Sequence, residues 1–194
     1  MKIKEGKILH TFANKIWHYN RSLTGEGTRE TLKKIKHINS NLKIKSIKSG
    51  TKVFDWTVPP EWIIHEAFIK DSKNKKIIDF KDNNLHIVNY SAPIKKIITL
   101  NDLDKKLHSI KDMPDAIPYV TSYYKKDWGF CIQDSKRKKL KKGNYEVNIK
   151  SKFIKGHMNY GEIFFKGKRK KEILLSTYIC HPSMFNFEIL FIRF

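Results

Sequence analysis

The sequence has 194 residues, of which 40% are hydrophobic and 12% aromatic, a composition that excludes an intrinsically disordered chain. Its formal net charge of +21 comes almost entirely from lysine, so the arginine-rich surface typical of base-reading proteins is absent and nucleic-acid binding is disfavoured. The N-terminus has no apolar signal core, no stretch reaches about 20 apolar residues, and Cys131 and Cys180 form no C-x-x-C pair, which together predict a cytoplasmic protein without membrane spans.

The first part of the chain predicts two helices joined by a glycine-rich loop. Residues 5–19 carry one apolar stripe, formed by Ile8, Leu9, Phe12, Ile16 and Tyr19. A second helix is expected after Gly25 and Gly27, with Thr28 as its N-cap and an apolar face of Leu32, Ile35 and Ile38. The loop follows a helix and lacks the Gly-Lys-Ser/Thr of a P-loop, so phosphate binding there is not favoured.

From Leu42 to Ile132 the pattern predicts a β-rich module. Its short apolar runs alternate with turn-forming residues: LKIKSIK, VFDWTV, WIIHEAFI, KIIDF, LHIVNY, IPYVTSYY and WGFCIQ. One short helix is expected within it, capped by Asn101 and with Leu103, Leu107 and Ile110 facing inward.

The last third predicts three further strands, YEVNIKSKF, HMNYGEIFF and EILLSTYIC. The third is an almost unbroken apolar run, which is typical of a strand buried on both faces of an α/β sheet. The densest basic run, residues 135–143, is interpreted as a solvated hairpin connection. The rival interpretation is a non-catalytic basic module that binds an anionic polymer, either a polysaccharide or a nucleic acid.

Most candidate catalytic residues have a structural interpretation that is at least as good. His65-Glu66 is not an H-E-x-x-H site, because Ile69 stands where the second histidine is required. The Pro60-Glu61-Trp62 segment favours packing around the Pro-Pro corner over a catalytic carboxylate. Five further histidines show no ligand spacing: His18, His37, His86, His108 and His157.

His181 is the strongest candidate ligand. It ends the last predicted strand, and ligand sites of open α/β sheets lie at the carboxyl ends of strands. Pro182 fixes the turn that follows. A metal-ligand role and a structural role are both open on this argument.

Five long blocks carry a resemblance to a known family: NRSLTGEGTRETL, SGTKVFDWTVPPEW, NLHIVNYSAPI, IPYVTSYYKKDWGFC and STYICHPSM. The sequence resembles bacterial aminopeptidase-like proteins, which are related to the di-zinc leucyl aminopeptidases and often encoded near polysaccharide biosynthesis functions. The resemblance implies an incomplete α/β peptidase-type domain with an inserted mainly-β domain. The implied domains are residues 1–48, the inserted residues 49–133, and residues 134–194, which return to the first strands of the peptidase-type sheet.

The resemblance also implies site residues, a zinc cofactor and a peptide or small amide substrate. His181 matches a metal ligand, whereas Phe187 stands where the family has the Asp that bridges two metals, and Phe185 stands where it has Ala; Asn186 matches. A phenyl ring supplies no anionic oxygen to a metal pair, and the only carboxylate after His181 is Glu188. We therefore expect a truncated N-terminal portion that is catalytically inactive, holds no stable zinc and self-associates through exposed strands.

Overall fold

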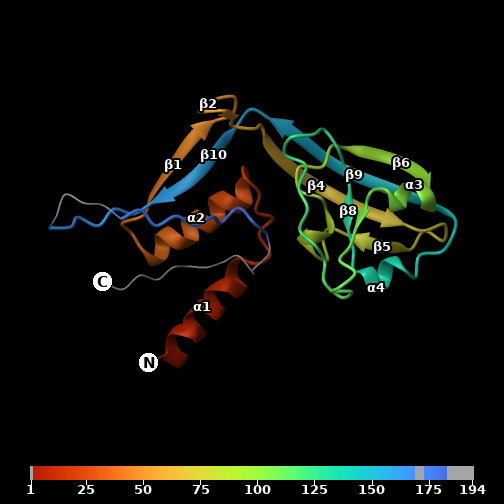
Figure 1. Ribbon diagram of the computed structural model, residues 1–194, viewed down its shortest axis with the longest axis horizontal. Coiled ribbons are helices and arrows are strands. Elements are labelled where there is room, and N and C mark those ends of the chain that lie inside the picture. Colours follow the sequence, from red (N-terminus) through yellow and green to blue (C-terminus); the bar gives the residue numbers. More distant parts are fainter. Residues whose placement is uncertain (1, 169–172, 183–194) are drawn as a thin grey trace. The chain divides into compact units, whose positions relative to one another are not determined.

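The computed structural model describes residues 2–168 and 173–182 of the chain (Figure 1). The chain divides into two compact units: unit 1 is residues 1–61 and 155–194, and unit 2 is residues 62–154. These limits differ from the predicted insert at 49–133, because strand β9 ends at Ile154 and belongs to the sheet of unit 2. The described residues form a mixed α/β fold with small sheets.

Unit 1 begins with two helices, α1 (Lys2–Ile16) and α2 (Glu26–Ile38). The predicted stripe of the first helix is confirmed at Phe12 and Ile16, which are buried, but Ile8 is exposed. Helix α2 begins earlier than predicted, with Gly25 instead of Thr28 at its N-cap. The reason is that the Thr28 hydroxyl donates to the backbone oxygen of Ser22, 2.6 Å away, and so ties the helix to the preceding loop.

Unit 1 also contains an antiparallel strand pair, β1 (Lys43–Lys48) with β10 (His157–Glu162). A small hairpin follows β1, formed by β2 (Lys52–Val53) and β3 (Trp56–Thr57). Helix α2 packs against β10 at Gly161, where an added Cβ would lie 3.0 Å from a methyl carbon of Leu32. A larger residue at this position would force the methyl ends of Leu32 and Leu42 to shift.

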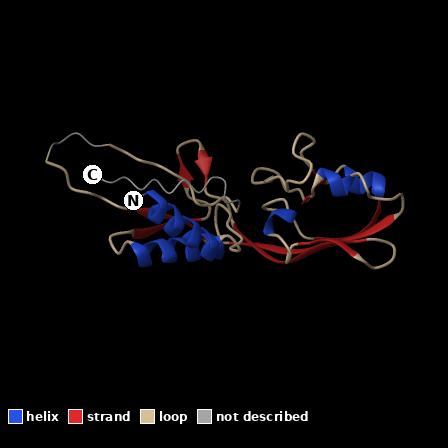
Figure 2. Ribbon diagram, turned by 90° about the horizontal axis from the view of Figure 1, so that it is seen from below, coloured by secondary structure: helices blue, strands red, loops and turns tan. Residues whose placement is uncertain are grey.

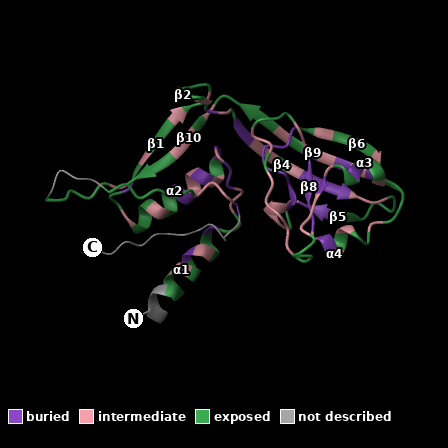
Figure 3. Ribbon diagram, in the orientation of Figure 1, coloured by how far each residue is buried: buried purple, intermediate pink, exposed green. Residues whose placement is uncertain are grey.

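Unit 2 is built on a four-stranded sheet with the order β5-β4-β9-β6. The strands are β4 (Glu61–Lys70), β5 (Lys76–Asp79), β6 (Ile94–Thr99) and β9 (Asn144–Ile154). Along β9, buried Tyr145, Val147 and Ile149 alternate with more exposed polar residues, as expected for a sheet with one covered face. The short helices and loops of this unit lie on one side of the sheet (Figure 2), and its strands carry much of the buried core (Figure 3).

Short elements complete unit 2: the 3₁₀ helix η1 (Asn84–His86), α3 (Leu100–Asp104), the parallel pair β7 (Leu107–His108) and β8 (Phe130–Cys131), and α4 (Asp134–Arg137). Helix α3 is shorter than predicted because Leu107 pairs with Phe130 in a strand. Its N-cap is Thr99 and not Asn101, since the Thr99 hydroxyl accepts a hydrogen bond from the Asp102 backbone.

Two predicted strands of unit 2 are irregular instead. Residues 85 and 86 belong to η1, and in residues 87–90 and 117–124 the structure has no strand but two isolated bridges, Ile87 with Phe130 and Asn89 with Thr121. These apolar residues are ordered by contacts distant in sequence, which a period-two pattern does not distinguish from a strand. The connection through residues 135–143 is also not a hairpin, because the strands on either side of it, β8 and β9, belong to different sheets.

The prediction that EILLSTYIC forms a buried strand is wrong for residues 173–180, the part of this segment that the structure describes. Residues 173–180 have no regular secondary structure, and Ile173 and Leu174 are 81% and 90% exposed. A strand needs a hydrogen-bonded neighbour, and no described strand pairs with this segment.

None of the helices in the described ranges combines the length and the apolar character needed to cross a bilayer.

Candidate functional site

The loop between α1 and α2 in unit 1 folds around its own buried polar groups. Arg21, Ser22, Thr24 and Thr28 are all almost completely buried. The Ser22 hydroxyl donates to the Thr24 backbone oxygen, and the Thr28 hydroxyl donates back to Ser22. Hydroxyl groups can satisfy the loop's backbone oxygens in this way where the chain is neither helix nor strand.

Gly27 allows this loop to close. A Cβ at this position would lie 2.2 Å from the backbone oxygen of Asn20, a separation that no real side chain tolerates. The first turn of α2 therefore sits directly against the residue before Arg21, and the sequence permits this only with glycine.

The Arg21 guanidinium binds three backbone oxygens and joins the two ends of unit 1. Its Nη1 donates to Ile16 at 2.6 Å, its Nε to His181 at 3.0 Å and its Nη2 to Pro182 at 3.1 Å. Because the guanidinium is planar and presents its donors in a fixed fork, these bonds fix the backbone on both sides of the His181-Pro182 peptide. The predicted ligand His181 is thus held against the end of α1.

We call Arg21 together with its three backbone acceptors the Arg21 clamp. Burial shifts the pKa values of the titratable groups in and beside it. Removal of Arg21 from water lowers the pKa of its guanidinium to about 10, which still leaves it charged at neutral pH. The neighbouring Cys180 thiol is partly buried, and this burial raises its pKa. Cys180 is therefore a neutral thiol near pH 7 and not an activated nucleophile.

A buried ion pair lies beside the loop. Glu61 accepts two hydrogen bonds from Arg29, at 2.9 Å from Nη1 and 2.6 Å from Nη2. The arginine holds the pKa of the Glu61 carboxyl below its usual range, and the carboxylate raises the pKa of Arg29. Glu61 also accepts a hydrogen bond from the backbone of His157 at 3.5 Å, so both of its carboxylate oxygens contact described residues.

The described residues fit one position of a zinc site and not a whole site. Zinc needs about three or four protein ligands, and His181 offers one imidazole. No group of three or more His, Cys, Asp or Glu side chains able to hold a metal occurs within residues 2–168 and 173–182. The residues on which the bridging-metal expectation depended, Phe185, Asn186, Phe187 and Glu188, lie outside the described residues.

The other histidines singled out by sequence have separate surroundings. His86 is buried, and its Nδ1 lies 2.8 Å from the backbone oxygen of Cys131; burial lowers the pKa of this imidazole. His65 lies on strand β4 with an exposed side chain, which confirms that His65-Glu66 is not a helical zinc motif. Cys131 is fully buried, and burial raises the pKa of its thiol to about 12.

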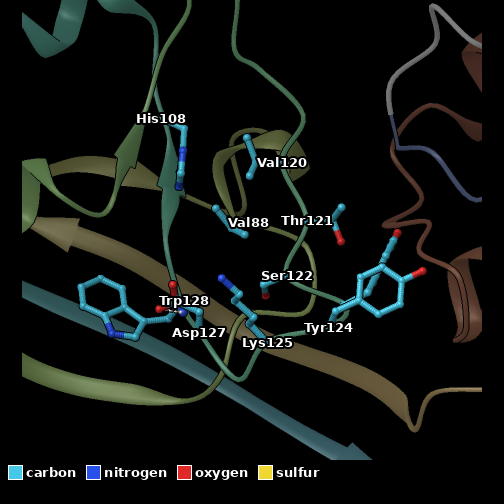
Figure 4. A pocket seen from close by; sticks show the side chains of 10 residues that line it. Val88, His108, Val120, Thr121, Ser122, Tyr124, Lys125, Asp127 and Trp128 are labelled. Carbon is cyan, nitrogen blue, oxygen red and sulfur yellow. Dashed lines mark hydrogen bonds between the residues drawn. The ribbon is translucent and has the colours of Figure 1, made fainter.

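Unit 2 contains a cavity of about 290 Å³ that sequence reasoning did not identify (Figure 4). It is lined mainly by the loop of residues 109–129 between β7 and β8, with Val88 and Val120 as apolar wall and the rings of Tyr123, Tyr124 and Trp128. The polar side chains that line it are His108, Thr121, Ser122, Lys125 and Asp127. The sequence pattern of residues 117–124 was interpreted as a strand, so the loop that lines the cavity was not predicted.

Arg21 was also missed by sequence reasoning. The available signal was one of only five arginines in a lysine-rich chain, next to a glycine-rich turn. Its partners His181 and Pro182 are 160 and 161 residues away, so no local pattern connects them.

The chain is similar to proteins described as peptidases or aminopeptidase-like. Residues 61–152, nearly all of unit 2, match the family model of a domain of unknown function, DUF2172. A Clostridium acetobutylicum protein named "Putative polysaccharide biosynthesis protein with aminopeptidase-like domain" is 48% identical over 182 residues, which cover 93% of this chain and 42% of that protein. The crystal structure of a "putative peptidase" from the same organism matches with a TM-score of 0.86 and 47% identity, over 94% of this chain and 43% of that one.

The chain thus spans about two fifths of the length of the relatives that it matches. The similarity supports a peptidase-like protein. It does not by itself assign a metal, a substrate or a partner to these residues.

Proposed function

We propose that this chain forms part of a zinc-dependent, peptidase-like hydrolase in which His181 is one metal ligand. The observation that carries the proposal is the Arg21 clamp, which binds the backbone oxygens of His181 and Pro182. Groups that fix the orientation of a metal-binding histidine typically change metal affinity about 10- to 100-fold when they are removed. Arg21 bonds the backbone and not the imidazole, so it supports the proposal by fixing the segment that carries His181.

The remaining ligands must come from outside the described residues, since His181 alone fills one of about three required positions. Phe187 stands where the resemblance places a bridging carboxylate. We therefore propose that the 194-residue chain by itself binds zinc weakly and hydrolyses no peptide.

The proposed substrate is a peptide or a small amide, because both relatives carry a peptidase-type name. The name of the clostridial protein also mentions polysaccharide biosynthesis. A role of this chain in that process is part of the proposal.

The test is a hybrid protein in which the aligned segment of the clostridial relative is replaced by the corresponding residues of this chain. Zinc content and release of p-nitroaniline from aminoacyl p-nitroanilides are measured. We expect the hybrid to bind zinc, and the His181→Ala variant to lose at least about 100-fold in zinc affinity. Arg21→Lys should lose about tenfold, because lysine lacks the planar fork.

The matched control is His157→Ala, since His157 is an exposed histidine on β10 in the same unit. It should leave zinc content and turnover unchanged. Zinc content that is equal in the hybrid and in its His181→Ala variant contradicts the proposal. The measurement of zinc content does not depend on activity, so it tests the proposal even if the hybrid hydrolyses no substrate.

A further inference from the structure

The loop of residues 109–129 in unit 2 is long, irregular and firmly held. The Asn89 backbone N–H donates to Val120 at 2.8 Å, and the Ser122 N–H donates back to Asn89 at 2.9 Å. At the other end, the Ala92 N–H donates to Asp127 at 2.8 Å. Loops longer than about 12–15 residues without secondary structure are uncommon in compact domains, and ordered ones are usually functional.

One aromatic ring of the cavity wall, that of Tyr123, is held by its neighbours in the absence of a ligand. The Tyr123 hydroxyl lies 2.7 Å from that of Tyr119, and the Tyr123 ring packs edge-on against buried Tyr90 at 4.7 Å. Tyr90 has a φ of 67°, a left-handed conformation that a bulky residue adopts only where its surroundings enforce it. Figure 4 shows Trp128 and Tyr124 on opposite sides of the cavity, with the Lys125 side chain pointing between them.

The cavity carries one uncompensated positive charge. Asp127 is neutralised by Lys106 at 2.6 Å, and its carboxylate also accepts from the Trp128 backbone N–H. Burial and the positive charge of Arg137 lower the pKa of His108, which is therefore neutral near pH 7. Lys125 forms no ion pair with any residue that the structure describes, so its ammonium group is available to an anion.

We infer that this cavity binds a sugar ring that carries a carboxylate, that is, a uronic acid residue. Tyr124 and Trp128 supply apolar ring faces for the C–H groups of the sugar, and Thr121 and Ser122 supply hydroxyl groups for its hydroxyls. Lys125 supplies the cation for the carboxylate. The volume of about 290 Å³ suits a single ring.

Other ligand classes fit this lining less well. A nucleobase is read by side chains that pair with its edges, and the cavity wall contains no Asn, Gln or Arg among the described residues. A phosphate group is typically held by an arginine fork or by several backbone N–H groups, and here one lysine faces the cavity. A neutral sugar would gain no ionic contact with Lys125, whose side chain is exposed to water.

The experiment titrates the full 194-residue chain with glucuronic and galacturonic acid, and separately with glucose, galactose and uridine monophosphate. Binding is followed by NMR through the indole N–H of Trp128, which a Trp128→Phe variant assigns. We expect the acidic sugars to shift this signal and to bind at least about tenfold more tightly than the neutral ones. No shift with either acidic sugar, equal affinity for the neutral sugars, or a preference for the nucleotide overturns the inference.

Two variants locate the site. Lys125→Gln should weaken uronic acid binding about tenfold, whereas the adjacent exposed Lys126→Gln, which does not line the cavity, should leave it unchanged. Tyr124→Ala should also weaken binding, and because Tyr124 is 83% exposed its loss should not alter thermal unfolding. Uronic acid binding that survives both Lys125→Gln and Tyr124→Ala excludes this cavity as the site.

Discussion

The two units of the molecule are stabilised in different ways. Among the described residues, unit 2 contains seventeen buried hydrophobic side chains and five buried polar ones. The described part of unit 1 contains five buried hydrophobic side chains, Phe12, Ile16, Leu32, Leu42 and Val58, and six buried polar ones, Arg21, Ser22, Thr24, Thr28, Thr31 and Glu61. Unit 2 therefore depends mainly on apolar burial, and unit 1 depends on a network of directed polar contacts.

This difference has a physical consequence for tolerance to mutation. Apolar burial is non-directional, so a core can adjust to a volume-conserving change with a modest loss of stability. A buried polar network loses much more when one partner is removed, because the groups left behind remain desolvated and unpaired. The stability of unit 1 should thus depend on the hydrogen-bonding groups of its side chains, and that of unit 2 on side-chain volume.

The largest effect is expected for Phe130→Ala in unit 2. Phe130 is fully buried on β8, and deleting a buried phenyl ring costs about 4 kcal/mol of unfolding free energy through lost burial and the cavity left behind. Urea denaturation combined with hydrogen exchange should show the loss of protection in unit 2. Phe130→Leu, which keeps most of the volume, should lose much less; equal losses would contradict apolar burial as the main term.

Arg21→Met should be next, with a loss of about 3 kcal/mol. Methionine keeps an extended apolar side chain but leaves three buried backbone oxygens without their donor. Hydrogen exchange should show the loss in unit 1. Arg137→Met is the control, since Arg137 forms a more exposed pair with Asp104 and should contribute less than about 1 kcal/mol. Similar losses for the two variants would refute the special role of Arg21.

Glu61→Gln should cost about 2 kcal/mol at neutral pH, a value reduced from that of a fully buried pair because the Arg29 side chain is 27% exposed. The folded pKa of Glu61 is lowered by Arg29, so this stabilisation is present above the ordinary glutamate pKa and disappears as pH falls through the lowered value. Urea midpoints of the wild type and the variant should converge once the pH falls below the lowered folded pKa of Glu61. A difference that does not depend on pH would rule out the ion pair as its cause.

The smallest effect is expected for Lys45→Gln. Lys45 and Glu162 lie 2.5 Å apart across β1 and β10, but both side chains are nearly half exposed. Surface pairs of this kind contribute little because water and salt screen them. The thermal midpoint should not change measurably, whereas a clear drop would show that unit 1 also relies on its exposed charges.

Regular elements were predictable wherever one face of a continuous segment is buried. Strands β4, β5 and β9 and helix α2 have buried residues and coincide with predicted runs. Strand β10 was also predicted, although none of its residues is buried. The prediction failed at residues 117–124 and 173–180, which are apolar in composition but have no ladder of strand partners among the described residues. Composition indicates that a segment can pair, and tertiary context decides whether it does.

His181 was singled out because it follows an apolar run that predicted a buried strand, and residues 173–180 form no strand in the structure. Whether His181 binds a metal stays a prediction. Arg21 and the cavity near Trp128 were not predictable, since each depends on contacts between segments far apart in sequence. A buried polar residue with distant backbone partners, or a cavity lined by a loop, leaves no periodic pattern in the sequence.

The contact between Glu61 and His157 has an evolutionary and a practical meaning. The chain leaves unit 1 at Glu61 and re-enters it at Lys155, and a hydrogen bond of 3.5 Å joins Glu61 to His157 just beyond the point of return. When the chain leaves and re-enters a domain at neighbouring positions, the segment between them can be inserted, removed or replaced without changing the path of the rest of the chain. Residues 62–154 could accordingly be excised and replaced by a short linker, while the Arg21 and Arg29 contacts described above retain all their partners.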